Sequence, residues 1–360
     1  MPFNGAGTFN RLYSWVTDAA NGIFVSSTRT DADTDDIATG LSTCITKDGQ
    51  TTVTANIPMA GFKFTGLAVG TATTDSARVD NANSYINEFR LTLTSGTPVT
   101  TSDVTAATTI YCTPYKGNHI ALYDGTNWHM RTSSEFSLAL GTLTAGVPYD
   151  VFCYDNSGTP TLEFLAWSTA TARATALTYQ DGVLSKTGAL TRRYLGTFMP
   201  YSTTQPADSA GFRLLWNYYN RARKFMRVVE ATASWSYSSA TIRAANNSSS
   251  NRLSFLIGVD EDVVSSYCCA QFSSNTANDW ANVGIGLDTT TAITSGCLIS
   301  SNASSAASSN ANAVASLQVY PGVGFHYLSW NESSHAGGTV TWVGVSGSFI
   351  QSGIHGEIFC

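Results

Sequence analysis

The stretch FRLLWNYYNRARKFMRVV, from Phe212 to Val229, is the only long segment of the chain with a clear helical period. Apolar and aromatic residues recur in it at steps of three and four, which places one stripe along one face of an α-helix. Asp208 and Ser209 stand just before it, and a short side-chain oxygen there can cap the first turn. The pattern predicts an amphipathic helix within residues 206–230.

This predicted helix carries a basic cluster beside its apolar stripe. Five of the 19 Lys and Arg residues fall between Arg213 and Arg227. Arginines in such a place pair with carboxylates or backbone carbonyls. We therefore expect a structural hub that joins two β-rich halves and also a place where identical chains meet. The expected oligomer interface consists of Leu215, Tyr218, Tyr219, Ala222 and Phe225, with Arg221 and Arg223 beside them.

The composition narrows the classes of partner. Only 12% of the residues are charged, and the net charge is −6. A nucleic-acid binder needs a positive field, so we expect no nucleic-acid partner. No apolar run reaches the length of a membrane span, so membrane insertion is not expected. The first residues, MPFNGAGTFNRLYSW, lack the basic and apolar regions of a secretory signal, which predicts synthesis in a cytoplasm without export by a cleaved signal.

Outside residues 206–230 the chain shows short alternating runs bounded by turn residues, which predicts a mainly β fold. We expect an extended segment over 1–84, a β-domain over 85–205, the helix over 206–230 and a C-terminal β-domain over 231–360, both β-domains being sandwich-like. Asp124-Gly125 supplies the turn of a hairpin, and Tyr149 is expected to hydrogen-bond back to the turn before it. The low-complexity run over 300–315 predicts a long surface loop.

Seven cysteines are present, and their spacing does not indicate a zinc site. Cys112 and Cys153 lie in apolar runs, where a buried free thiol is expected. Cys360 is the last residue of the sequence, so an exposed thiol is expected there. Cys44 and Cys360 are the candidates for a disulfide to another chain.

Residues 56–68, NIPMAGFKFTGLA, and residues 70–77, GTATTDSA, form a motif of glycines and short polar residues. The motif resembles a segment that recurs in bacteriophage tail fibres and appendage proteins, and residues 41–52, LSTCITKDGQTT, extend the likeness. This chain departs from the commoner pattern at Ala60, where a second glycine is frequent, and at Cys44. Several later stretches, among them YDGTNW at 123–128 and WNYYNR at 216–221, resemble a phage module that has no firmly assigned activity.

This resemblance implies a virion protein made in the cytoplasm of a bacterial host. It implies a homotrimeric tail fibre or related appendage, whose residues 1–84 dock onto other virion proteins of the tail, neck or capsid. A neck, collar or head fibre that reinforces the particle is the alternative within the same class. The distal β-domain would present a surface to host polysaccharide or protein.

A glycan-degrading tailspike is the alternative from another class. Glycoside cleavage needs two carboxylates across a cleft, and the spacing of Asp and Glu singles out no pair. His119 and His129 supply two metal ligands at most, and the chain has no nucleophile elbow or phosphate loop. We therefore expect no catalytic residue, metal or cofactor. Three tryptophans flanked by polar residues are candidates for stacking on sugar rings: Trp128, Trp280 and Trp330.

Overall fold

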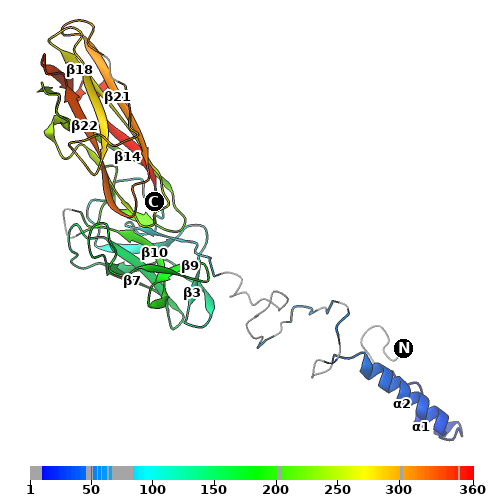
Figure 1. Cartoon of the computed structure of the whole chain (residues 1–360). Coiled ribbons are helices and arrows are strands. Elements are labelled where there is room, and N and C mark those ends of the chain that lie inside the picture. Colours follow the sequence, from blue (N-terminus) through cyan, green and yellow to red (C-terminus); the bar gives the residue numbers. More distant parts are fainter. Residues whose placement is uncertain are drawn as a thin grey trace. The chain divides into compact units, whose positions relative to one another are not determined.

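A computed structural model describes residues 10–45, 50, 52–54, 56–57, 59–62, 65–66, 84–201, 205–300, 303–347 and 349–360. The chain divides into two compact units, Met1–Ala68 and Val69–Cys360. The fold is mainly β, as predicted, and both of the α-helices described lie in the first unit (Figure 1). Much of the fibre-like motif, including residues 67–68 and 70–77, lies outside the described residues.

The first unit is not wholly extended, so this expectation was wrong where the structure describes the segment. It contains helix α1 (Trp15–Ala20) and helix α2 (Ser27–Ser42). The Oγ of Ser14 accepts the N–H of Thr17, and the Oγ of Ser26 accepts the N–H of Arg29, so each helix has a side-chain cap. Asp and Thr favour helices weakly, and α2 is rich in both, which explains why its sequence did not predict a helix.

The two helices bury little apolar surface within their own unit. Among residues 10–45 the buried side chains are those of Asp18 and Asp33, together with Gly40. Ile37, Leu41 and Ile45 are 39%, 64% and 61% exposed. A helix of this length is marginal in water without packing. The described part of the unit thus leaves an apolar surface on α2 and just beyond it that the unit itself does not cover.

The second unit begins with two sheets that enclose a core. A three-stranded sheet has the order β1-β2-β5, and a larger sheet has the order β7-β6-β10-β9-β8 with β13 also paired to β10. Phe89, Ile110, Val151 and Phe198 meet between them. The strand bounds are β1 (Phe89–Thr92), β2 (Thr109–Pro114), β3 (His119–Tyr123), β4 (Trp128–Thr132), β5 (Phe136–Ala139), β6 (Tyr149–Asn156), β7 (Thr159–Ala166), β8 (Leu177–Gln180), β9 (Val183–Lys186), β10 (Ala189–Phe198) and β13 (Leu215–Asn217).

Two local predictions are confirmed in this half. Strands β3 and β4 pair as an antiparallel hairpin, with Gly125 at a φ of 108° in the turn. Asp124 accepts the N–H groups of Thr126 and Asn127, both at 2.7 Å. The Tyr149 hydroxyl accepts the N–H of Thr144 at 2.9 Å, so the tyrosine does bond back to the preceding turn.

The remaining strands form two larger sheets. One has the order β11-β12-β17-β22-β16 with β19 on β22; the other has the order β14-β26-β18-β21-β20, with β23 on β18 and β15 on β23. Their bounds are β11 (Asp208–Ser209), β12 (Phe212–Arg213), β14 (Arg223–Val229), β15 (Ser234–Tyr237), β16 (Arg243–Ala244), β17 (Arg252–Ile257), β18 (Val264–Ser274), β19 (Ala281–Leu287), β20 (Leu298–Ser300), β21 (Asn310–Val319), β22 (Gly324–Ser334), β23 (Val340–Val343) and β26 (Gly353–Phe359). A short hairpin, β24 (Val345–Ser346) with β25 (Ile350–Gln351), and the turn η1 (Ala245–Asn247) complete the elements.

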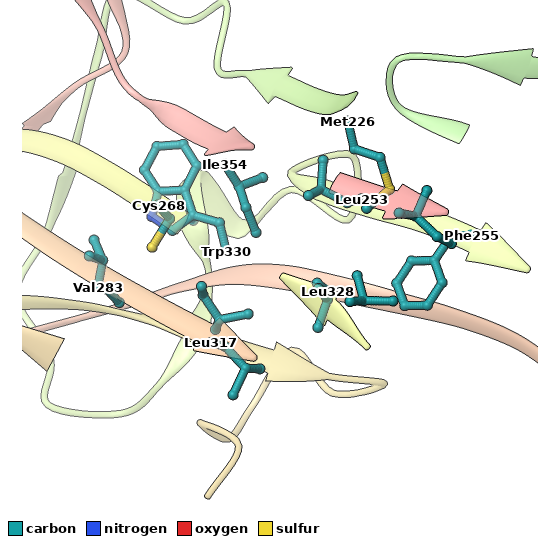
Figure 2. Packing of buried hydrophobic residues seen from close by; sticks show 14 of the residues in the cluster. Met226, Leu253, Phe255, Cys268, Val283, Leu317, Leu328, Trp330 and Ile354 are labelled. Atoms are coloured by element: carbon teal, nitrogen blue, oxygen red, sulfur yellow. The ribbon is translucent and has the colours of Figure 1, made fainter. Parts of the chain in front are cut away.

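Side chains from both larger sheets interdigitate in one apolar core. Figure 2 shows Met226 and Ile354 from one sheet and Leu253, Phe255 and Trp330 from the other among its members. Phe152 and Tyr194, from β6 and β10, belong to the same cluster. The sheet that contains β6 and β10 is therefore covered by apolar side chains on both faces, and the two β-rich halves share a core within one compact unit.

The predicted helix over 206–230 is wrong. The segment forms β11, β12, β13 and β14, with a turn at Asn220, which has a φ of 54° and cannot continue a helix. In β14 exposed and buried residues alternate: Lys224 and Met226 face inward, whereas Arg223 and Phe225 face outward. The apolar residues of this segment fit the two-residue period of a strand as well as the three- and four-residue steps of a helix. Pairing with β26 selects the strand.

The predicted surface loop over 300–315 is wrong in its second part. Strand β21 begins at Asn310, and Ala313, Ala315 and Leu317 point into the core. This strand was not predicted because its residues are small, and alternation between Ala and Asn or Ser gives only a weak hydrophobic signal.

Candidate functional site

The outward side of the β14-β26-β18-β21-β20 sheet carries the candidate site, and we call it the outer face. Strand register places its residues in rows across the sheet. One row runs Arg227, His355, Tyr267, Ser316 and Leu298, one residue from each of the five strands. The next row runs Phe225, Glu357, Ser265 and Gln318. Residues far apart in sequence are thus immediate neighbours.

A groove of about 830 Å³ lies on this face. Phe225, Tyr267, Leu298 and His355 supply its larger side chains, and Ser265 and Ser316 are among the small polar residues between them. A pocket of about 170 Å³ shares Tyr267 and His355 with the groove and is also lined by Arg227, Cys269 and Gln351. The groove and the pocket therefore meet along the Tyr267–His355 pair.

Aromatic surface on the outer face remains open to solvent. Phe225 is 59% exposed and Tyr267 is 37% exposed. The rings of Tyr267 and His355 lie 5.3 Å apart between centroids, with 47° between their planes. Ligand sites typically combine apolar or aromatic surface with a few convergent polar groups, and this face has both.

The charges on the outer face do not all cancel. Arg223 donates to Glu357, with 2.6 Å between Nε and Oε2, so this pair is neutral as a whole. Arg227 stands opposite His355 in the register and has no ion-pair partner among the residues that the structure describes. Burial raises the pKa of Cys269, so the thiol beside them stays protonated near neutral pH and is a poor nucleophile.

The structure does not bring the seven expected interface residues onto one surface. Leu215 is buried in the core. Tyr218 and Tyr219 contact each other edge to face at 4.8 Å and are partly buried. Arg221 is clamped by Glu261 and Asp262, each at 2.6 Å.

Ala222 is partly buried, and its main chain exchanges two hydrogen bonds with Cys360. Only Arg223 and Phe225 of the seven are exposed, both on the outer face. The expectation that these arginines pair with carboxylates is nevertheless confirmed at Arg213, Arg221 and Arg223.

Two of the three candidate stacking tryptophans are buried, so those predictions were wrong. Trp128 is 4% exposed and donates its indole N–H to Asp181 at 2.9 Å. Trp330 is fully buried against Trp235. Trp280 is partly exposed and lies 5.6 Å from the ring of His335. Polar neighbours in sequence do not imply exposure in a strand, because adjacent residues face opposite sides.

Phe225 and Tyr267, which line the groove on the outer face, were not assigned to a ligand site from the sequence. The alternation of polar and apolar residues in β14 was the signal from which an outward position of Phe225 could have been predicted.

The terminal thiol is also placed differently from expectation. Cys360 is fully buried, and burial raises its pKa to about 11, so its proposed role in an inter-chain disulfide is wrong for the chain in this fold. Cys112 and Cys153 are buried free thiols, as predicted. Cys44 is exposed, and its cross-link stays a prediction.

Several charged groups elsewhere in the second unit are held in pairs. His119 contacts Glu88 and His129 contacts Asp124, so the two histidines are directed to different carboxylates. Arg173 pairs with the buried Asp150, whose pKa burial raises, and Arg243 pairs with the buried Glu332. Among the described residues there is no group of three potential metal ligands. No helix in the described part of the chain has the length and apolar character to cross a membrane.

Comparison with known proteins gives no family for this chain. No protein-family model matches it, and no curated protein matches it. The insecticidal delta-endotoxin Cry8Ea1 of Bacillus thuringiensis is similar at 8% identity and a TM-score of 0.23 over 76% of this chain and 52% of the toxin chain. This chain thus spans about half the toxin's length. A Cry1Da core variant from the same organism is similar at 9% identity and a TM-score of 0.12.

Proposed function

We propose that this chain is a structural component of a bacteriophage virion, a homotrimeric tail fibre or related appendage without enzymatic activity. The resemblance of residues 41–77 to fibre segments supports the class of protein. The outer face is the observation that supports a binding role: it combines a groove of about 830 Å³ with exposed aromatic rings and with Arg227, which has no ion-pair partner among the described residues. In this proposal, residues 1–84 dock onto the particle and the outer face meets the host surface.

The exposed apolar side chains of α2 and the residues after it support the docking role. Ile37 and Leu41 are four residues apart in α2, so they lie on one side of the helix, and Ile45 follows shortly after the helix ends. Full burial of an exposed side chain of this size contributes about 1.5–3 kcal/mol, and covering these partly exposed side chains contributes a fraction of that. A partner on the particle would provide that cover, whereas the described part of the unit does not.

Adsorption of phage to host cells tests this proposal. The full-length chain, added in excess, should occupy receptors and reduce adsorption, and antibody against it should label the appendage in electron micrographs. The double variant Ile37→Ser and Leu41→Ser should be lost from purified particles, while the matched exposed change Ala38→Ser should be retained. Labelling of the neck or head without any block of adsorption would instead assign a reinforcing fibre. Release of reducing ends from host polysaccharide would assign an enzyme.

A further inference from the structure

We infer that the outer face binds an acidic saccharide, with a sugar ring against Phe225 and Tyr267 and its carboxylate between Arg227 and His355. This inference rests on the proposed function, because it names the class of host molecule that the outer face would meet. It assigns the groove and the adjoining pocket to one ligand, since both share Tyr267 and His355.

The aromatic part of the inference follows from Phe225. Phe225 keeps 59% of its surface exposed, although Met226, the next residue, is fully buried. Full burial of an aromatic side chain contributes about 1.5–3 kcal/mol, and a side chain that stays partly in water lacks part of this stabilisation. The apolar C–H face of a pyranose ring covers such a surface and leaves the sugar hydroxyls at its edge for polar partners. Ser265, Gln318 and Ser316 lie in the adjacent positions and present such groups.

The electrostatic part follows from Arg227 and His355. Directly opposed residues of antiparallel strands have Cα atoms about 4.5–5.5 Å apart, so the two side chains can reach one group. A guanidinium binds a carboxylate through two parallel hydrogen bonds, and Arg227 has its donors free of ion pairs among the described residues. Glu357, the nearby carboxylate on the same strand as His355, is neutralised by Arg223. The outer face therefore attracts a single negative group, although the whole chain has a net charge of −6.

The shape of the outer face disfavours a two-fold contact with a second copy of the chain, whereas a head-to-tail contact between copies of the proposed trimer is tested below by the oligomer mass. In a two-fold interface the same patch meets itself. Two copies of this groove would then face one another and enclose unfilled space, whereas stable interfaces pack as densely as protein interiors. Such a contact would also bring Arg227 and His355 of both copies together.

Binding of defined oligosaccharides by the full-length chain tests the inference. The probes are hexasaccharides of polygalacturonate and the same hexasaccharides after reduction of each carboxyl to an alcohol, measured by calorimetry. The acidic probe should bind, and the reduced probe should bind at least tenfold more weakly, which corresponds to about 1.4 kcal/mol. Phe225→Ala and Arg227→Gln should each weaken binding of the acidic probe by tenfold or more. The affinity of Arg227→Lys for the acidic probe should lie between that of Arg227→Gln and that of the parent, because an ammonium keeps the positive charge but cannot form the two parallel hydrogen bonds of a guanidinium.

Tyr115 and Lys116, two consecutive exposed residues, provide matched controls. Tyr115→Ala and Lys116→Ala remove an exposed ring and an exposed cation away from the outer face, so they should bind like the parent. Both test positions are exposed, so their variants should keep the parent's circular dichroism, and only a small fall in melting temperature is expected for Phe225→Ala, whose ring lies 5.6 Å from the guanidinium carbon of Arg213.

Equal binding of the acidic and reduced probes, or no effect of Phe225→Ala and Arg227→Gln, would overturn the inference. A loss of oligomer mass in Phe225→Ala, measured by light scattering, would show that a second copy covers this face and would also overturn it. The proposed function stands separately. If the chain blocks phage adsorption but the acidic probe does not bind, only the saccharide assignment fails; if the probe binds but the chain is absent from particles, only the proposed function fails.

Discussion

Asp208 and Arg213 form an ion pair of 3.0 Å that is almost withdrawn from water, with side chains 3% and 5% exposed. Lys224 contacts the other carboxylate oxygen of Asp208 and is itself 8% exposed. Arg213 also donates to the main-chain carbonyl of Phe225. Two of the five basic residues in the predicted helix are therefore internal, and one carboxylate holds two strands of different sheets together through two cations.

Replacing Asp208 should be costly. Asp208→Asn leaves two buried cations without a counter-charge, and breaking a buried pair in this way costs about 3–5 kcal/mol. The free energy of unfolding, measured by urea denaturation, should fall by that amount. Glu357→Gln removes the partner of the exposed Arg223 and should change it by about 0–1 kcal/mol. Similar small losses in both variants would contradict a stabilising role for the buried cluster.

The hydroxyl of Tyr149 should contribute measurably to stability. Tyr149→Phe keeps the ring stacked on Phe198 but leaves the N–H of Thr144 without its acceptor. The expected loss is about 1 kcal/mol in the free energy of unfolding. Tyr320→Phe removes the hydroxyl of a tyrosine that is 68% exposed and should have no measurable effect. An unchanged midpoint for Tyr149→Phe would show that the turn does not depend on this bond.

The β3–β4 turn should lose stability in acid. Hydrogen bonds from the N–H groups of Asn127 and Thr126 lower the pKa of Asp124 to about 2. An unfolded aspartate titrates near a pKa of about 3.9. The lowered pKa contributes stability that is present above about pH 4 and is lost as the pH falls toward about 2. Asp124→Asn keeps an acceptor oxygen without the charge, so melting temperatures between these pH values should fall less steeply than in the parent. Parallel profiles would refute the assignment.

The cysteines should separate into classes of reactivity. Cys44 is exposed and should react first with a maleimide in the native protein. Cys112, Cys153, Cys268 and Cys360 are buried, and burial raises the pKa of Cys153 to about 12, so these thiols should react only after unfolding. Peptide mass spectrometry after a short pulse distinguishes them. Fast labelling of Cys360 in the native state would contradict its buried position.

The sequence predicted the β-rich fold and several strands well because their signals are local. The turn at Asp124-Gly125 was predicted from these two residues themselves, and it joins β3 and β4 as a hairpin. The helix prediction failed for residues 223–229 because their pattern fits both a helical and a strand period. Only pairing with β26, more than a hundred residues later, selects the strand.

The candidate site could not be read from the sequence for the same reason. Its rows join Arg227 to His355 and Tyr267 to Ser316, and these neighbours exist only after the register is set. Trp128 was assigned to the surface from its polar sequence neighbours and Cys360 from its position as the last residue, and both are instead buried.

The position of β26 has a consequence for the order of folding. It pairs with both β14 and β18 and so lies in the interior of its sheet. During synthesis β14 and β18 leave the ribosome well before it, and each then lacks its shared neighbour. Exposed strand edges of this kind are prone to pair wrongly. A nascent chain therefore leaves these two edges unpaired until Gly353–Phe359 is available, and the rows of the outer face that join them form only when it pairs with both.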